Sequence, residues 1–227
     1  MTSHPMVNAQ YNIAKAGSLP ARIAGNMRRQ MFDMFLRESR IAASDTILDV
    51  GATSDRTYDH SNYLEAWYPH KDRITAVGID DASFLEKVYP GLTFRQANGL
   101  NLPFTDDSFD FVHSSAVLEH VGCRANQRRF ITELYRVCRR GLFLTTPNRW
   151  YPIEFHTVLP LLHWLPARVF RSVLLLIGRE FFAKEENLNL LGRRELAEIA
   201  TGAGLHKFTI DVVYLGMPSN LILIATK

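Results

Sequence analysis

Four apolar runs of this sequence, each short enough to be a buried strand, lead into polar residues that could do chemistry. Asp49 and Gly51 end the run "TILDVG", and Asp80 ends "ITAVGID". Asn98 follows a third run, and Ser114 lies at the end of a fourth. A carboxylate can hold the two hydroxyls of a ribose, and a glycine lets a ligand approach the backbone closely. Together these positions predict a nucleoside site, although each Asp alone is equally consistent with a turn.

The turn after the first run narrows the kind of nucleoside. A dinucleotide-binding turn repeats glycine so that backbone N–H groups and a helix N-terminus can approach a pyrophosphate. Here Gly51 is followed by Ala52, Thr53 and Ser54, which disfavours a pyrophosphate. A nucleoside without phosphates needs one close-approach glycine, an acid for its hydroxyls and negative charge for any cationic group. S-adenosylmethionine, with its ammonium and sulfonium, meets this description.

The elements that must position these residues alternate between strand and helix. Residues 27–41 place Met27, Met31 and Phe35 on one helical face, and further helical patterns start at Ser61 and run through 130–138 and 196–203. The chain closes with "KFTIDVVYLG" and "SNLILIATK", two strand-like runs joined through "MPS". The pattern predicts an α/β fold, a Rossmann-like doubly wound seven-stranded sheet that is mostly parallel and has a C-terminal antiparallel hairpin. Ligands of such sheets bind at the carboxyl ends of the strands, where the polar residues lie.

Composition and charge exclude several classes of protein. The 227 residues are 47% hydrophobic and 22% charged, which favours a single domain over residues 1–227, with an N-terminal helical cover over 1–41. The net charge is +3 and the arginines form scattered pairs, so we expect no nucleic-acid partner. Cys123 and Cys138 form no C-x-x-C motif, and the N-terminus has no apolar signal-peptide core. We therefore expect a cytoplasmic protein.

Several motifs resemble one family. The stretches "ILDVG", "AVGID", "ANGLNLPFTDDSFDFVHSSAVLEHV" and "GLFLTTPNRWYP" are together similar to the class I S-adenosylmethionine-dependent methyltransferases of the methyltransferase type 11 group. The similarity is strongest with the small-molecule branch that includes the quinone-biosynthesis C-methyltransferases. It covers residues 46–152, and "LPF-x-D-x-SFD" is its most specific part. The resemblance implies an enzyme that takes its methyl group from S-adenosylmethionine.

The resemblance also implies roles for individual residues. Asp49 would face the methionine amino group, Asp80 would hold the ribose hydroxyls, and Asn98 would contact the adenine. His120 in "LEHV" is the candidate catalytic residue, although it is also consistent with a simple helix start. The expected cofactor-binding residues are Asp49, Gly51, Thr53, Ser54, Asp80, Asn98, Gly99, Leu100 and Ser114.

Two alternatives to a small-molecule methyltransferase stay open. A non-catalytic binding protein with a decayed cofactor loop would show the same glycine-poor turn. A methyltransferase that acts on a macromolecule would share the same motifs, but the modest charge disfavours it.

Residues 147–190 are an apolar insertion between the fifth strand and the next helix. Pro160, Pro166 and scattered charges interrupt it too often for a transmembrane helix. It predicts a lid over an acceptor pocket, a surface for peripheral membrane contact, or a homodimer interface through residues 150–182. We favour the lid, which implies a small, apolar or lipid-like acceptor, with Asn148 and His156 on the acceptor side.

Glu154, His156 and His163 in this insertion are residue types that bind metals. Their spacing speaks against a metal site, because E-x-H places neighbours on opposite faces of a strand and Pro160 prevents one regular helix. The sequence therefore predicts no metal among them.

Overall fold

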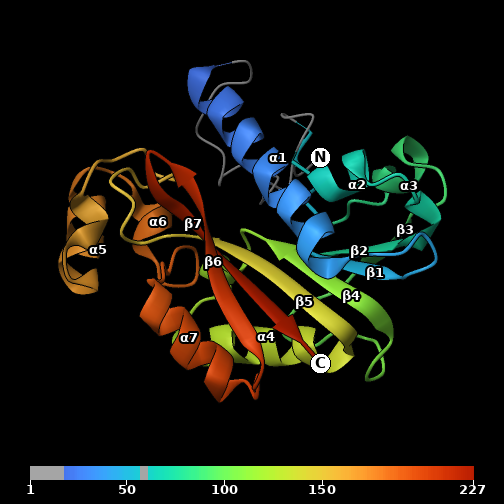
Figure 1. Cartoon of the computed structure of the whole chain (residues 1–227). Helices are drawn as coiled ribbons and strands as arrows, with labels where there is room; N and C mark the ends of the chain where they lie inside the picture. The colour runs from blue at the N-terminus through green and yellow to red at the C-terminus, as the bar shows by residue number, and fades with distance from the viewer. Residues whose placement is uncertain (1–17, 57–60) are drawn as a thin grey trace.

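The computed structural model describes residues 18–56 and 61–227, which contain a seven-stranded sheet (Figure 1). The strands are β1 (Ile47–Val50), β2 (Ile74–Gly78), β3 (Thr93–Gln96), β4 (Phe109–Ser115), β5 (Cys138–Pro147), β6 (Phe208–Leu215) and β7 (Met217–Thr226). They lie in the order β3-β2-β1-β4-β5-β7-β6. The first five are parallel, and β7 runs antiparallel to both β5 and β6. This confirms the predicted doubly wound α/β sheet.

The strand order reverses between β1 and β4, which pair with each other in parallel. In this register Asp49 of β1 lies opposite His113 of β4. The connections that leave two such strands turn to opposite faces of the sheet, and ligands of doubly wound sheets bind there. The fold therefore predicts a ligand site at the turns that follow β1 and β4.

The C-terminal hairpin differs from the sequence prediction in one detail. "MPS" does not form the connection, because β7 already begins at Met217 and Pro218 pairs with Tyr214. The turn lies at Gly216, whose φ is 70°. Glycine adopts this left-handed conformation without the steric cost of a side chain, so the turn is tighter than the sequence suggested.

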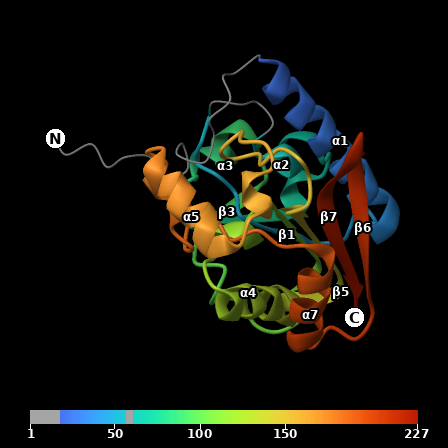
Figure 2. The same cartoon turned by 90° about the vertical axis from the view of Figure 1, so that its left-hand side faces the viewer.

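Helices cover both faces of the sheet (Figures 1 and 2). One face carries α1 (Leu19–Ser39), α2 (Tyr63–Trp67) and α3 (Phe84–Val88), and the other carries α4 (Arg124–Val137) and α7 (Arg193–Gly202). A single-turn 3₁₀ helix, η2 (Lys71–Arg73), precedes β2. Each face has its own apolar core, which holds the strand ends in place.

Two predicted helix starts are shifted. The first helix begins at Leu19 rather than near Met27, because the Ser18 hydroxyl accepts a hydrogen bond from a first-turn N–H group. Residues 1–17 of the expected N-terminal cover lie outside the described residues. The second helix is capped at Asn62 rather than Ser61, and the Asn62 amide bonds to the preceding turn instead of to the helix.

The insertion between β5 and α7 carries η4 (Leu162–Trp164), α5 (Ala167–Leu176) and α6 (Glu180–Ala183). It leaves and rejoins the sheet at one place, where Asn148 bridges to Leu191. Buried apolar residues give it a small core of its own, and α5 stands apart from the sheet in Figure 1. No helix in the described ranges is both long enough and apolar enough to cross a membrane.

Candidate functional site

The turn after β1 depends on Gly51. Its φ is 119°, a conformation that L side chains rarely adopt, and a Cβ atom here would lie 2.1 Å from Cγ2 of Val117. Val117 belongs to the connection that follows β4. Gly51 therefore lets the two turns at the crossover of the sheet approach each other.

The backbone donors of this turn are used within the protein. The N–H groups of Gly51 and Ala52 both donate to one carbonyl of β2, at 2.8 and 2.9 Å. The Thr53 N–H group donates to Asn62 Oδ1 at 2.8 Å, and the Asp55 N–H group donates to the Thr53 hydroxyl at 3.1 Å. These four groups cannot also cradle a pyrophosphate, in agreement with the sequence argument. The Thr53 hydroxyl keeps its own O–H as a donor.

Asp49 lies at the end of a buried hydrogen-bonded chain. His113 Nδ1 is 2.5 Å from Asp49 Oδ1, and the Tyr63 hydroxyl is 2.9 Å from His113 Nε2. Burial lowers the pKa of His113 to about 4, so its ring is neutral at pH 7. The neutral ring donates from Nδ1 to Asp49 and accepts the Tyr63 hydroxyl at Nε2. This chain fixes the Asp49 carboxylate beside the turn that Gly51 shapes.

A second carboxylate, Glu65 of α2, lies beside Asp49. Glu65 is fully buried, and its carboxyl group has no hydrogen-bond partner other than the neighbouring Asp49 carboxyl group. Burial and the neighbouring Asp49 charge raise the pKa of Glu65 well above its ordinary value, and burial raises the pKa of Asp49 to about 6. Two neighbouring buried carboxyl groups are costly to ionise unless a cation joins them. The pair is therefore suited to a positively charged ligand group.

The other predicted cofactor residues on the first three strands lie at or just beyond the strand ends. Ser54 in the turn after β1 and Asp80 after β2 are both partly buried. Asn98, after β3, is exposed, and its Oδ1 accepts the Leu100 N–H group at 2.9 Å. This local turn leaves the Asn98 oxygen one lone pair and its NH₂ group for a ligand.

Two predicted cofactor residues serve packing in this structure. The buried Ser114 hydroxyl donates to the Val50 carbonyl at 2.7 Å, which joins β4 to β1. A Cβ atom at Gly99 would lie 2.4 Å from the Phe130 ring, so this glycine makes room for α4. Both residues therefore help to position the strand ends through contacts with the rest of the protein.

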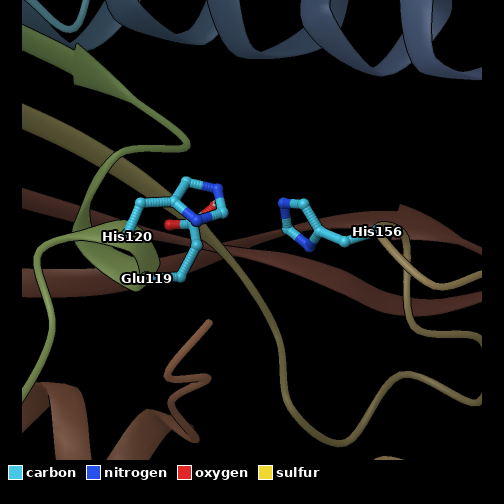
Figure 3. Close-up of side chains that lie close together, drawn as sticks. All are labelled: Glu119, His120 and His156. Carbon is cyan, nitrogen blue, oxygen red and sulfur yellow. Dashed lines mark ion pairs between the residues drawn. The ribbon is translucent and has the colours of Figure 1, made fainter. Parts of the chain in front are cut away.

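A second cluster lies past the carboxyl ends of β4 and β5. The single-turn helix η3 (Leu118–His120) carries Glu119 and His120, and the insertion places His156 opposite them (Figure 3). The ring centroids of His120 and His156 are 4.7 Å apart in an edge-to-face arrangement. The structure thus brings together two histidines that the sequence assigned separately, one to catalysis and one to the acceptor side.

Glu119 and His120 are held by their neighbours. His120 Nδ1 donates to the Asn187 carbonyl at 2.7 Å. Glu119 is fully buried, and its Oε2 accepts the Thr146 hydroxyl at 2.9 Å while its Oε1 has no hydrogen-bond partner. Burial raises the pKa of Glu119 and lowers that of His120 to about 3, so His120 is neutral at pH 7.

Glu154 orients His156 from within the insertion. Glu154 Oε1 accepts both the N–H group and the Nδ1–H group of His156, at 2.8 and 2.7 Å, and Oε2 accepts the Thr157 N–H group. Burial opposes the charge on Glu154, but His156 and Thr157 outweigh it and hold the pKa of Glu154 at about 2. Burial also opposes the charge on His156, but Glu154 outweighs it and raises the pKa of His156. The two residues form a buried ion pair.

Asn148 and His163 stabilise the insertion itself. The Asn148 NH₂ group donates to the Pro218 carbonyl at 2.8 Å, and its Oδ1 accepts the Trp150 N–H group at 3.1 Å. His163 Nε2 donates to the Tyr151 carbonyl at 2.7 Å. Asn148, predicted on the acceptor side, therefore fixes the point where the insertion leaves the sheet.

Sequence reasoning missed His113, Tyr63 and Glu65. His113 has a signal in hindsight, because "FDFVHSS" can be aligned with "TILDV" so that Asp49 and His113 are neighbours. Glu65 has none, since a single Glu in a short helix is usually exposed.

Comparison with known families identifies the core of the fold. Residues 48–145 match the model of a family described as a methyltransferase domain, and they extend from β1 into β5. Residues 48–145 form a class I S-adenosylmethionine-dependent methyltransferase domain. The protein is thus a methyltransferase, and its cofactor is S-adenosylmethionine. A search among curated proteins gives no match.

Solved structures share the fold of this methyltransferase. An S-adenosylmethionine-dependent methyltransferase from Methanosarcina mazei is 20% identical, with a TM-score of 0.54 over 85% of this chain and 96% of that one. The magnesium protoporphyrin IX methyltransferase of Synechocystis PCC 6803, solved with bound S-adenosylhomocysteine, is 14% identical, with a TM-score of 0.60 over 97% and 92%. A putative methyltransferase of Haloferax volcanii, in complex with the Trm112 methyltransferase activator, is 16% identical, with a TM-score of 0.60 over 91% and 93%.

The residues of the methyltransferase fit its cofactor. The buried Glu65 carboxyl group has no hydrogen-bond partner other than the Asp49 carboxyl group, and this pair of acids suits the ammonium of the methionine moiety. The left-handed Gly51 leaves the adjoining backbone without a side chain, and Asp80 follows β2. When bound, the cofactor supplies a methyl group on a sulfonium.

Proposed function

We propose that this methyltransferase methylates a small, apolar or lipid-like molecule, with the insertion as its acceptor side. One observation carries the proposal. Of the fourteen large apolar side chains that are exposed among the described residues, ten belong to the insertion. They include Leu175 and Leu176 on α5, Ile177 directly after α5, and the two tryptophans Trp150 and Trp164. Apolar side chains gathered on one segment mark a surface that meets an apolar partner.

The charges on α5 and in the turn after it support an acceptor that resides in a lipid surface. Arg168 and Arg179 flank the exposed apolar residues and are themselves exposed, whereas Arg171 pairs with Glu185 at 3.6 Å. Arginines beside an apolar helix face are typical of helices that lie in the membrane interface. An acceptor dissolved in the membrane would then enter from the side of the insertion.

The histidine cluster is placed to act on such an acceptor. Methyl transfer from a sulfonium depends mainly on proximity and orientation, and it needs a base only when the acceptor atom is protonated. His120 is neutral and lies three residues after Val117, which touches the Gly51 turn. His120 is therefore our candidate for orienting or deprotonating the acceptor, with His156 beside it.

Label transfer tests this function. After incubation of the enzyme with methyl-labelled S-adenosylmethionine and a cell extract, we expect the label in the organic phase. Replacing Leu175 and Leu176 with serine should lower transfer to vesicle-borne acceptor about tenfold or more, because the apolar contact with the membrane is lost. Binding of S-adenosylhomocysteine, measured by calorimetry, should stay the same.

The control for this patch is Tyr214→Ser, which removes an exposed apolar side chain outside the insertion and should leave transfer unchanged. Label that appears in protein or nucleic acid would contradict the small apolar acceptor. A dimer that dissociates in the double serine variant would assign the patch to a second copy of the chain instead.

For the cofactor we propose that Asp49 and Glu65 together hold the methionine ammonium, Asp80 holds the ribose and Asn98 contacts the adenine. The chain through His113 and Tyr63 would keep the Asp49 carboxylate in place. This assignment of roles explains why Glu65, a buried acid whose neighbour is another acid, is present at a site where it lowers stability.

Replacing Glu65 with glutamine should raise stability and weaken cofactor binding. The raised pKa means that Glu65 binds its proton more tightly when folded, so its stabilising contribution is complete at low pH and is lost as pH rises toward the folded pKa. The amide cannot ionise and escapes this loss. We expect a gain of about 1 to 3 kcal/mol in unfolding free energy at pH 8 and a smaller gain at pH 5. S-adenosylhomocysteine should bind about tenfold more weakly.

Urea denaturation at both pH values and calorimetry measure these effects. Glu198→Gln is the control, because Glu198 is an exposed acid on α7 and should change neither quantity. Tighter or unchanged cofactor binding by Glu65→Gln would remove Glu65 from the ammonium site.

A further inference from the structure

We propose that Glu119, His120 and His156 bind a divalent transition metal of the Zn²⁺ class, which joins the insertion to the edge of the sheet. One ligand atom from each residue lies within 4.8 Å of the other two. Figure 3 shows the two imidazole rings on either side of a gap in an edge-to-face arrangement, with the Glu119 carboxylate beside the His120 ring. Glu119 and His120 come from η3, and His156 comes from the insertion.

Neighbouring residues hold the three proposed ligands in place by hydrogen bonds, as is usual around a protein metal site. His120 donates Nδ1–H to the Asn187 carbonyl, and His156 donates Nδ1–H to Glu154. His120 then has its lone pair on Nε2, and His156 gains one there when the incoming metal ion displaces the Nε2 proton of its ion pair with Glu154. Metal-binding histidines are usually fixed in this way, by a carbonyl or a carboxylate on the other ring nitrogen. Glu119 is in turn held by the Thr146 hydroxyl on Oε2.

The remaining Glu119 oxygen is an independent sign of a missing partner. Glu119 is fully buried, its Oε1 has no hydrogen-bond partner, and this atom lies 3.8 Å from His120 Nε2. An unpartnered buried carboxylate oxygen is unfavourable unless a cation or a donor meets it. Glu154 adds a second buried carboxylate behind His156. One divalent ion would neutralise both.

Two imidazoles and one carboxylate favour zinc and related transition metals, whereas Mg²⁺ and Ca²⁺ prefer oxygen ligands throughout. Bonds of about 2.1 Å in tetrahedral geometry put ligand atoms roughly 3.4 Å apart. Small side-chain rotations would therefore close the three atoms around the ion and leave a fourth position open. The metal would fix the insertion against η3, to which it is otherwise held by backbone and amide contacts such as the bond from the Asn189 N–H group to the Glu119 carbonyl at 2.8 Å.

The test uses the full chain, stripped of metal with a chelator and titrated with Zn²⁺. We expect one Zn²⁺ per chain, a higher melting temperature with bound Zn²⁺, and a Co²⁺ derivative with the visible spectrum of a four-coordinate site. Glu119→Gln and His156→Ala should each weaken Zn²⁺ binding about 100-fold or more. Glu154→Gln, which only loosens the orientation of His156, should weaken it about tenfold.

His206→Ala is the matched control, because His206 is an exposed histidine outside the cluster and should bind Zn²⁺ like the wild type. Retained S-adenosylhomocysteine binding shows that a variant is folded, and Glu154→Gln remains informative if His156→Ala does not fold. The proposal is overturned if the folded wild type takes up no Zn²⁺. It is also overturned if Glu119→Gln and Glu154→Gln bind Zn²⁺ with the affinity of the wild type. The titration needs no acceptor, but a bound ion would occupy Nε2 of His120, so a positive result would make His120 a metal ligand and not the base of the proposed function.

Discussion

Replacing Asp80 with alanine is expected to weaken S-adenosylhomocysteine binding by roughly 30- to 150-fold. Asp80 follows β2, next to the crossover between β1 and β4. A carboxylate there can accept hydrogen bonds from both ribose hydroxyls, and bonds to a charged group contribute about 2 to 3 kcal/mol together. Calorimetry with the purified variant measures the loss directly. The melting temperature should change little, because the side chain is only partly buried.

Asp81→Ala is the matched control for this prediction. Asp81 is the next acid in the chain, and its carboxylate accepts the Ser83 N–H group at 2.9 Å, which places it in a local turn. This variant should bind S-adenosylhomocysteine within about threefold of the wild type, because the Asp81 carboxylate is exposed and bonds within its own turn. If Asp81→Ala loses affinity and Asp80→Ala does not, the two roles are reversed.

Replacing Gly51 with alanine should damage both stability and cofactor binding. The new Cβ atom would meet Val117 at 2.1 Å, and the backbone would keep a φ of 119° that alanine tolerates poorly. Strain of this kind costs about 1 to 3 kcal/mol, and forcing an extra methyl into a packed site costs a similar amount. We therefore expect the unfolding free energy to fall by about 3 kcal/mol or more, with S-adenosylhomocysteine binding weakened at least tenfold.

Two further variants separate the strain from the clash. Gly204 also has a positive φ, 88°, but a Cβ atom at this position would have nothing within 4 Å, so Gly204→Ala reports the backbone strain alone. Gly51→Ala combined with Val117→Ala removes the clash and keeps the strain. Denaturation should rank the single Gly51 variant as less stable than either. Equal stability of Gly51→Ala and Gly204→Ala would show that the two turns can move apart at no cost.

The sequence predicted the sheet because its strands are apolar runs that end in turn residues, and such runs report burial directly. Asp80 and Asn98 could be located for the same reason, since each stands immediately after a strand. Boundaries that depend on one cap or one turn were wrong, by about eight residues at the helix start after Ser18 and by two residues at the strand start after Gly216. The energy differences that decide such boundaries are small and local.

The side-chain clusters could not be predicted, because they join residues that are distant in sequence. His120 and His156 are brought together by the path of the insertion, which follows no short-range rule. The sequence argument against a metal compared His156 only with Glu154 and His163, its neighbours along the chain. Periodicity describes which face a residue occupies, and says nothing of which distant element faces it.

The bridge between Asn148 and Leu191 means that the insertion enters and leaves at a single seam of the fold. A segment with adjoining ends can be exchanged as a cassette, because a short linker spans the gap without displacing β5 or α7. The small core around Phe170 and Leu174 would travel with it. The proposed methyl donor site, whose acids Asp49 and Glu65 come from β1 and α2, would remain in place. Related enzymes could therefore diversify their acceptors by replacing this one segment, and an engineer could graft a new one at the same seam.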